Sequence, residues 1–520
     1  MNDPEIPTKS EPTTRLSRRA ALAGGAALGI IPIAGWQLSA RARQEATPAG
    51  ASRVPGHDPA GTTHDHVATP TAGPARTPIA DPLAYGFVQG AELSEPEVRQ
   101  SKDGLLETTL TASMGLTTVA GMPVTALTFD GLMPGPTLRL NAGDTLKVTF
   151  DNQLDQMTNL HTHGFHVSPG GNSDNIFVTI DPGATFAYQY DLPTNHPPGT
   201  YWYHPHHHGL TNPQVGMGLA GVILQDGIVD LVPGLASYPT KLLAIQALQF
   251  DTDGVVLPGS LRTDPMHLVN GQWQPVIRIA PGEIQRWQIA NITAGNVYQI
   301  ALENHVLTQI AADANPFDSP HEQPEFLLGP GERADVLVQG SAIPGTYQLR
   351  HLMWGMGSQF TPDLVLATVI VEGAPVTSDP IPELLAPFED LRLTQPDRQR
   401  EIVFQTVENA ENPYLIDGRP FDEHRVDQRV PLNAMEEWVI YNTSEEWHPF
   451  HIHVNDFQVV AIDGEPYTAH SYDDTFLIPA HGSFTMRSRF LDFTGKYVYH
   501  CHILFHEDHS MMGVVEVVDE

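Results

Sequence analysis

One short pattern recurs three times in the chain and limits the folds that are open to it. Each copy has a turn at Asn-Gly or Asp-Gly, a short strand-like run, a second turn and a second run that ends in asparagine. The copies occupy residues 130–152, 270–291 and 417–442. From Leu105 onward, short alternating or apolar runs dominate and helical periodicity is scarce. We therefore predict an all-β protein built from three related β-sandwich domains.

The predicted domain boundaries fall where turn-forming residues concentrate, near 226–240 and 372–399. A chain of 520 residues is too long for a single core. We place the three domains at 84–232, 233–375 and 376–520. The middle domain carries no paired-histidine motif, so its predicted role is structural, either spacing the outer two domains or shaping a substrate face.

The charge balance is strongly acidic. The chain has 61 acidic and 27 basic side chains, and its formal net charge is −34. Such a surface repels nucleic acid and anionic membranes, so neither is expected as a partner. Neutral or cationic small molecules remain suitable partners.

The C-terminal segment holds the only cysteine, Cys501, between His500 and His502. Successive side chains of a strand face opposite sides, so Cys501 would face one side and both histidines the other. His506 and Met511 follow shortly after Cys501. Thiolate, imidazole and thioether belong to the ligand set of a blue-copper centre, which still lacks one histidine. A lone cysteine is otherwise most often a small buried apolar residue.

Histidine clusters upstream supply the missing ligands. In a strand, the two histidines of a His-x-His motif share one face and can hold one metal or two neighbouring ones. The motifs are His161-Thr-His163, His204-Pro-His206 and His448-Pro-Phe-His451-Ile-His453. In the last motif, His448 can turn toward a different metal from His451 and His453. The alternative pair His206 and His208 is also open, because histidine continues to position 208.

The four spacings H-x-H, H-x-H, H-x-x-H-x-H and H-C-H-x₃-H-x₄-M resemble the copper-binding motifs of three-domain multicopper oxidases, the laccase-like family. The resemblance implies three consecutive cupredoxin-like Greek-key β-sandwich domains and four copper ions. It implies type 1 copper on His448, Cys501, His506 and Met511, type 2 copper on His161 and His451, and a type 3 pair on His163, His204 and His502 and on His206, His453 and His500. It therefore places a trinuclear site between the first and third domains.

The expected reaction is one-electron oxidation of phenols or aromatic amines at type 1 copper, coupled to four-electron reduction of O₂ to water. His500 and His502 flank Cys501, so the backbone joins the two sites. Glu507 and Asp174 are candidate proton-transfer groups. The alternatives are a hydrogen bond that orients a ligand for Glu507 and an ordinary turn residue for Asp174.

Two other functions compete with this one. A metal-ion oxidase acting on Cu(I), Fe(II) or Mn(II) would use the same copper sites. An electron carrier without turnover needs only the type 1 set, so the remaining histidines argue against it. For the laccase-type reaction we expect a ring edge of His448 or His506 to reach the surface. Glu445, Glu446 and Trp447 would then form an acidic, aromatic rim that favours electron-rich cationic aromatics. The alternative is that Glu445 and Glu446 belong to an ordinary solvated turn.

The N-terminus predicts export. Residues 1–42 contain Arg18 and Arg19 before a short Gly/Ala-rich apolar run, which is typical of a twin-arginine-type signal peptide. An ordinary signal peptide or an anchor is the alternative. We expect a periplasmic, extracytoplasmic or secreted protein without a membrane span once mature. Residues 43–83 are predicted to be a disordered Pro/Ala/Thr-rich linker, whose histidines (His57, His64 and His66) are more simply solvated than copper-bound.

Overall fold

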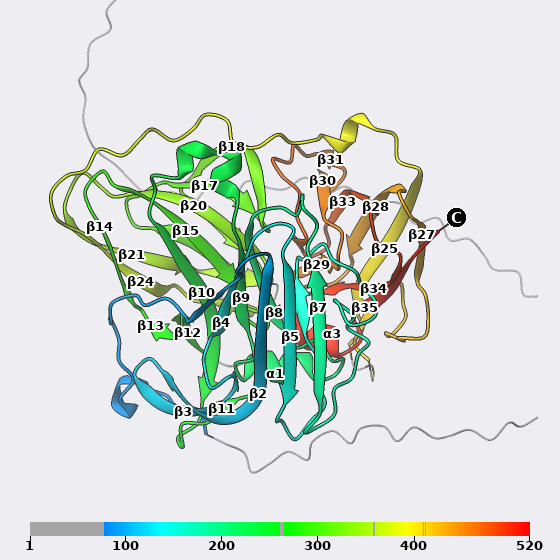
Figure 1. Ribbon diagram of the computed structural model, residues 1–520, viewed down its shortest axis with the longest axis horizontal. Coiled ribbons are helices and arrows are strands. Elements are labelled where there is room, and N and C mark those ends of the chain that lie inside the picture. Colours follow the sequence, from blue (N-terminus) through cyan, green and yellow to red (C-terminus); the bar gives the residue numbers. More distant parts are fainter. Residues whose placement is uncertain (1–76, 260–264, 357–358, 409, 411, 520) are drawn as a thin grey trace, which may run out of the picture. The chain divides into compact units, whose positions relative to one another are not determined.

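The computed structural model describes residues 77–259, 265–356, 359–408, 410 and 412–519 (Figure 1). The predicted signal peptide and most of the predicted linker lie outside these residues. The last part of that linker is described, and the N–H of Ile79 already donates to the carbonyl of Phe250 at 2.9 Å. Among the described residues, no helix combines the length and the apolar character that crossing a membrane requires.

The first domain is a sandwich of two sheets with strand orders β3-β2-β5-β7 and β1-β4-β9-β8-β6. Its strands are β1 (Val98–Gln100), β2 (Leu105–Val119), β3 (Met122–Phe129), β4 (Gly135–Leu140), β5 (Thr145–Asn152), β6 (His161–His163), β7 (Thr185–Asp191), β8 (Gly199–His204) and β9 (Gly221–Gln225). The short helices η1 (Leu83–Tyr85), α1 (Thr211–Gly216), α2 (Ile228–Leu231) and η2 (Pro233–Leu235) lie before, within and after it along the chain.

The middle domain pairs a sheet of order β13-β12-β10-β15-β20-β17-β18, with β11 beside β10, and a sheet of order β14-β24-β21-β16-β19. Its strands are β10 (Thr240–Phe250), β11 (Val256–Leu257), β12 (Met266–Val269), β13 (Gln272–Trp273), β14 (Val276–Ile279), β15 (Ile284–Asn291), β16 (Tyr298–Leu302), β17 (Leu307–Ala312), β18 (Asn315–Gln323), β19 (Glu325–Leu328), β20 (Arg333–Gln339), β21 (Gly345–Leu352) and β24 (Leu364–Val371). A separate hairpin joins β22 (Trp354–Met356) and β23 (Gln359–Thr361).

The third domain pairs sheets of order β26-β25-β28-β33-β30-β31 and β27-β35-β34-β29-β32. The 3₁₀ helix η3 (Leu391–Leu393) precedes its strands, which are β25 (Arg398–Thr406), β26 (Tyr414–Ile416), β27 (Gln428–Pro431), β28 (Met435–Asn442), β29 (His448–Ile452), β30 (Phe457–Ile462), β31 (Glu465–Pro466), β32 (Thr475–Ile478), β33 (Ser483–Arg489), β34 (Gly495–Cys501) and β35 (Met512–Val518). Helix α3 (Leu504–Asp508) lies between the last two strands.

The sequence repeat corresponds to one structural unit in each domain. Its two strands are β4 and β5, β14 and β15, or β27 and β28, and in every case the first strand belongs to one sheet and the second to the other. The closing asparagine is buried each time and donates to a distant carbonyl: Asn152 to Ile180, Asn291 to Leu328 and Asn442 to Pro479, at 2.8 to 3.0 Å. The prediction of three consecutive cupredoxin-like sandwiches is therefore confirmed.

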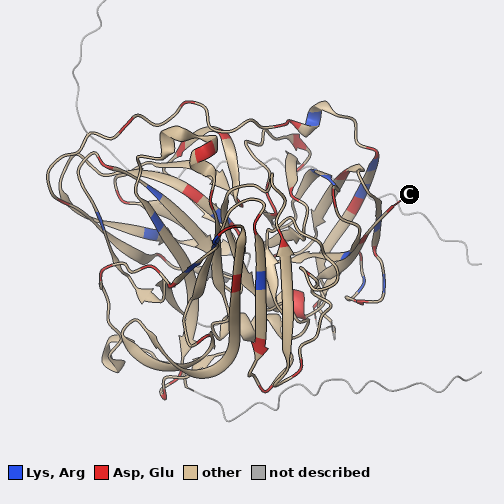
Figure 2. Cartoon of the chain, in the orientation of Figure 1, with Lys and Arg blue, Asp and Glu red and all other residues tan. Residues whose placement is uncertain are grey.

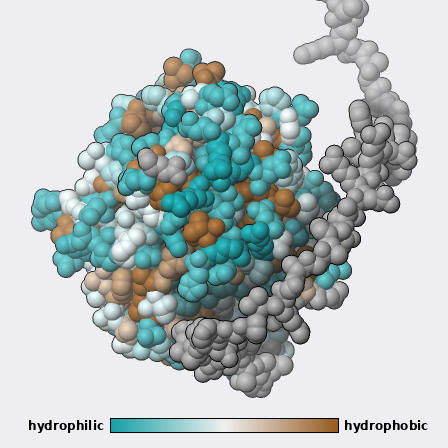
Figure 3. Space-filling model, turned by 90° about the vertical axis from the view of Figure 1, so that its right-hand side faces the viewer, coloured by the Kyte–Doolittle hydropathy of each residue, from teal (hydrophilic) through white to brown (hydrophobic). Residues whose placement is uncertain are grey.

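The surface reflects the acidic composition. Acidic positions outnumber basic ones along the chain (Figure 2). The face in Figure 3 is mostly hydrophilic, with small separate hydrophobic patches. Most of the large aromatic and aliphatic side chains of the strands lie inside the three sandwiches, as Phe150, Trp287 and Trp438 illustrate.

Candidate metal centres

The end of strand β34 serves two sites, as strand alternation predicts. Cys501 faces the interior of the third domain, where its Sγ lies 3.4 Å from His448 Nδ1 and 3.6 Å from His506 Nδ1. The two histidine nitrogens are 3.2 Å apart. The centre of a triangle with such edges lies about 2 Å from each corner, close to ordinary metal–nitrogen and metal–sulfur bond lengths.

The chemistry of this triangle calls for a cation. All three side chains are buried. Burial raises the pKa of the Cys501 thiol and lowers the pKa of His448 to about 3, so both imidazoles are neutral donors. A bound metal ion would reverse the effect on the thiol, because coordination stabilises the thiolate. Met511 is buried in the same core cluster. Its backbone N–H donates to the carbonyl of His506, and its backbone carbonyl accepts from the N–H of Cys501.

The second site is a cluster of eight buried histidines, four from each terminal domain. In the first domain, the four histidines come from β6, from the end of β8 and from the segment just after β8. In the third domain, they come from β29, from the residue just after β29 and from the two positions that flank Cys501 at the end of β34. Figure 1 shows β8, β29 and β34 close together near the centre of the view. The cluster consists of His161, His163, His204, His206, His451, His453, His500 and His502.

The cluster holds neutral imidazoles with unused nitrogen atoms. Burial lowers the pKa of His204 to about 3 and of His451 to about 4. Several buried ring nitrogens of the cluster lack a hydrogen-bond partner among the described residues, including His161 Nε2, His163 Nδ1, His204 Nε2 and His451 Nε2. Buried polar atoms are normally paired, and neutral imidazole nitrogens are good copper ligands. The donor set therefore fits copper.

The predicted ligand groups lie together to different degrees. His206 Nε2 and His453 Nε2 lie 3.2 and 3.3 Å from His500 Nε2 and converge most closely. In the second type 3 set, ring centroids are 4.8 to 6.1 Å apart, among His163, His204 and His502. The rings of the predicted type 2 pair, His161 and His451, are 6.0 Å apart.

The alternative histidine register does not fit this arrangement. His204 and His206 are buried in the cluster, whereas His208 is exposed and packs on Phe421 with ring centroids 4.7 Å apart. The two candidate acids do lie at the cluster. Asp174 contacts His161 Nδ1 at 2.9 Å. Glu507 has one oxygen 3.4 Å from His206 Nδ1 and the other 3.3 Å from His500 Nδ1.

Burial shifts the pKa of both acids upward. Burial raises the pKa of Asp174 to about 7, although hydrogen bonds from Thr162 oppose the shift. Burial also raises the pKa of Glu507 well above its ordinary value, with a further contribution from Asp508. A carboxyl group that titrates near the working pH is suited to proton transfer.

One expectation about the Cys501 site was wrong. His448 and His506 are 0% and 1% exposed, so neither ring edge reaches the surface. Tyr414 covers one face of His506, with ring centroids 3.9 Å apart and nearly parallel planes. Glu446 Oε2 lies 3.8 Å from His506 Nε2. The sequence gives no sign of this contact, because Tyr414 lies on β26 and His506 lies on α3, about ninety residues later in the chain.

Aromatic and acidic side chains surround this site from two domains. Trp447 meets Trp354 of the middle-domain hairpin edge to face, with ring centroids 5.2 Å apart. Glu445 is 89% exposed at its side chain and lies 3.1 Å from His481 Nε2. Glu446 therefore lies beside a buried ligand ring, whereas Glu445 lies in solvent.

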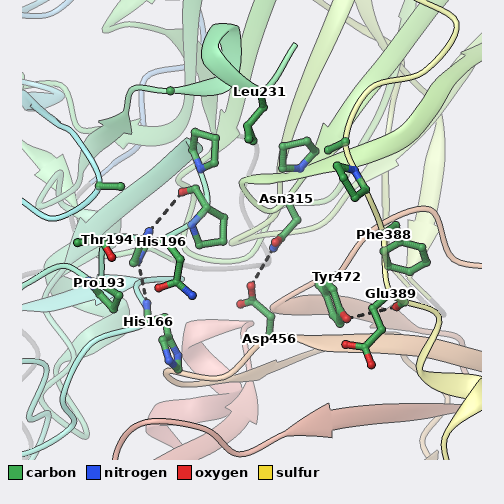
Figure 4. Close-up of a pocket in the computed structure, with 18 of the residues that line it drawn as sticks. His166, Pro193, Thr194, His196, Leu231, Asn315, Phe388, Glu389, Asp456 and Tyr472 are labelled. Atoms are coloured by element: carbon green, nitrogen blue, oxygen red, sulfur yellow. Dashed lines mark hydrogen bonds between the residues drawn. The ribbon is translucent and has the colours of Figure 1, made fainter.

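A cavity of about 750 Å³ lies where parts of all three domains meet (Figure 4). Phe388 and Tyr472 line it, and Asn315 donates to Asp456 at 2.9 Å in its wall. Asn315 also donates to the backbone carbonyl of Asp313. The carboxylate of Asp313 in turn forms an ion pair with the buried Arg333 of the middle domain.

Two further residues of the histidine cluster escaped sequence analysis. Asp474 lies 3.1 Å from His163 Nε2, and Arg333 forms an ion pair with Asp474. Neither belongs to a histidine motif. The only sequence sign is an arginine at the start of the otherwise mostly apolar strand β20.

Comparison with known proteins agrees with the geometry. Three family models, each described as multicopper oxidase, match residues 111–227, 244–372 and 394–520. A multicopper oxidase of Staphylococcus haemolyticus is 27% identical over 446 residues, covering 82% of this chain and 93% of that protein. A laccase of Bacillus stratosphericus is 26% identical over 474 residues, covering 76% of this chain and 92% of that protein. The solved structure of a multicopper oxidase from Campylobacter jejuni, described as a metallo-oxidase, has a TM-score of 0.74 at 27% identity and covers 84% of this chain and 97% of that one.

The histidine register is tested by a pair of matched variants. We expect His206→Ala to lose about one or more bound copper ions per chain, because it removes a buried ligand. His208→Ala should bind as much copper as the parent, since His208 is exposed. Metal analysis after copper loading and removal of loosely held metal measures both. Loss of copper from His208→Ala alone would contradict the register.

Proposed function

Because the chain belongs to the multicopper oxidase family, we propose that it is a laccase-type enzyme that oxidises phenols and aromatic amines and reduces O₂ to water. The observation that carries this proposal is that the end of strand β34 contributes side chains to both donor sets. Cys501 sits in one donor set, and its two neighbours, His500 and His502, sit in the other. A carrier protein would not need the second set.

Twelve side chains would hold four copper ions in this proposal. His448, Cys501, His506 and Met511 would hold type 1 copper; His161 and His451 type 2; His163, His204 and His502 one type 3 ion; and His206, His453 and His500 the other. The bound ions would supply one-electron oxidation of the substrate and four-electron reduction of O₂. Burial of the histidine cluster between two domains excludes bulk water from it.

The protein itself must deliver protons to the histidine cluster. Glu507 bridges two histidines of the proposed type 3 set, and Asp174 contacts a proposed type 2 ligand. A protonated carboxyl at each position can release a proton as charge changes nearby and later take up another. We assign proton transfer to both residues.

The surroundings of His506 support an aromatic substrate. Glu446 lies near the remaining ring nitrogen of His506 and can accept a hydrogen bond from a phenol or attract an ammonium group. Trp447 and Trp354 provide aromatic surface beside it. Electrons would pass through covering side chains such as Tyr414, because the ligand rings are buried.

A metal-ion oxidase is the second candidate. The same two carboxylates, Glu445 and Glu446, could bind a cation, and Met353 of the middle domain is 69% exposed just before the hairpin that carries Trp354. The Campylobacter jejuni relative is described as a metallo-oxidase. Oxygen uptake by copper-loaded protein, with phenols, aromatic amines, Cu(I), Fe(II) and Mn(II) compared side by side, distinguishes the two candidates.

Cys501→Ser tests the type 1 assignment. Loss of the thiolate should abolish the blue colour and substrate oxidation, while about three of the four coppers remain bound. Absorption spectra and metal analysis measure these results. If the variant oxidised substrates at the rate of the parent, Cys501 would not be on the electron path.

Glu507→Gln keeps the shape of the side chain but removes its proton. Oxygen reduction should slow about 10²-fold or more, with the blue colour intact. The sign of the pH effect follows from the raised pKa: the parent loses activity as pH rises through that pKa, and the variant should lack this decline. Steady-state O₂ uptake across pH measures it. Glu516→Gln on β35 is the control and should keep the pH profile of the parent. An identical profile for the parent and Glu507→Gln would show that Glu507 has only a structural role.

Replacing Glu445 and Glu446 together with glutamine tests the substrate site. KM for cationic aromatic amines should rise more than KM for anionic dyes, because attraction to the carboxylates is lost. A double variant at exposed Glu107 and Glu401 controls for net charge. Equal changes for both dye classes, or far faster oxidation of Cu(I) by the parent, would count against laccase-type specificity.

A further inference from the structure

One buried arginine of the middle domain, Arg333, contacts all three domains. Its Nε donates to the carbonyl of Thr200 in the first domain at 2.9 Å, and its Nη1 donates to the carbonyl of Gly331 at 3.0 Å. Nη1 and Nη2 also donate to the two carboxylate oxygens of Asp474 in the third domain, at 2.8 and 2.6 Å. The guanidinium lies over the ring of Tyr201. This two-point pairing fixes the plane of the Asp474 carboxylate.

Asp474 in turn contacts one proposed copper ligand from each terminal domain. Its Oδ1 lies 3.1 Å from His163 Nε2. Its backbone carbonyl lies 2.8 Å from His451 Nδ1. The hydroxyl of Thr475 donates to the same Oδ1 at 2.8 Å and lies within 3.3 Å of both imidazoles.

These contacts determine which nitrogen of each ring is left for a metal. A carboxylate and a carbonyl only accept hydrogen bonds, so His163 must donate from Nε2 and His451 from Nδ1. A neutral imidazole carries one N–H, and its other nitrogen keeps a free lone pair. The other nitrogen of each ring, His163 Nδ1 and His451 Nε2, has no hydrogen-bond partner among the described residues.

The middle domain also approaches the cluster with its backbone. A Cβ added at Gly331 would lie 3.1 Å from atoms of both the His163 and His502 rings. The loop that positions the guanidinium therefore packs directly on two histidines. A domain that merely spaced the outer two would not need this contact.

We propose that Arg333 is a positioning residue for the trinuclear site, acting through Asp474 to select the ring nitrogens of His163 and His451 that bind copper. The inference rests on the proposed function for the identity of the metal. The tautomer of His163 does not depend on that identity. Partners that orient metal ligands typically change metal affinity by about 10–100-fold when they are replaced.

The first test uses full-length, metal-free protein with ¹⁵N-labelled histidine. In the parent, we expect the His163 signal, assigned with His163→Gln, to report a proton on Nε2. In Arg333→Met that preference should be lost. Arg286→Met is the matched control, because Arg286 is another largely buried arginine of the middle domain whose partner, Asp335, contacts Thr200 rather than a histidine. An unchanged His163 signal in Arg333→Met would overturn the proposal.

The second test measures copper loading of the same proteins. Arg333→Met should keep the blue type 1 colour but bind type 2 and type 3 copper about 10–100-fold more weakly, with a diminished type 2 paramagnetic signal. Arg286→Met should load like the parent. If Arg333→Met does not fold, Asp474→Leu replaces it, with the same two expectations, because leucine has no acceptor for His163 Nε2. Full loading with an unchanged type 2 signal would overturn the proposal, whereas a parent that binds no copper would overturn the proposed function and leave the tautomer result standing.

Discussion

The structure depends on the burial of eight imidazoles in the seam between the first and third domains. Each ring is neutral there because desolvation lowers its pKa, and several ring nitrogens have no hydrogen-bond partner in the protein. Such a seam carries a cost in the metal-free protein that bound copper ions would offset by using those lone pairs. We therefore expect metal binding to stabilise the docking of these two domains.

Strand alternation explains how one short segment serves two sites. Cys501 points into the core of the third domain, while His500 and His502 point into the seam. The distance between the two donor sets is thus determined by the covalent backbone of a strand. Loops could not hold that distance as constant, because they are more mobile than paired strands.

The middle domain has no histidine motif, yet it contributes to both sites. Arg333 and Gly331 support the histidine cluster, and Trp354 lies beside Trp447 next to the Cys501 site. The expectation that this domain is structural was incomplete for a physical reason. A positioning residue acts through hydrogen bonds to a distant segment, so it follows no spacing rule of its own.

The sequence by itself determined the local features of this protein. The repeat that ends in Asn152, Asn291 and Asn442 predicted three like sandwiches, since turn residues and strand alternation depend on neighbouring residues of the chain. The sequence His500-Cys501-His502 predicted that one segment would serve two sites, because strand alternation depends only on neighbouring residues. Only the tertiary structure decided which segments meet: Asp474 with His163, Arg333 with Asp474, and Tyr414 with His506. It also decided that the ring edges of His448 and His506 are buried, because the side chains that cover them come from segments far apart in the chain.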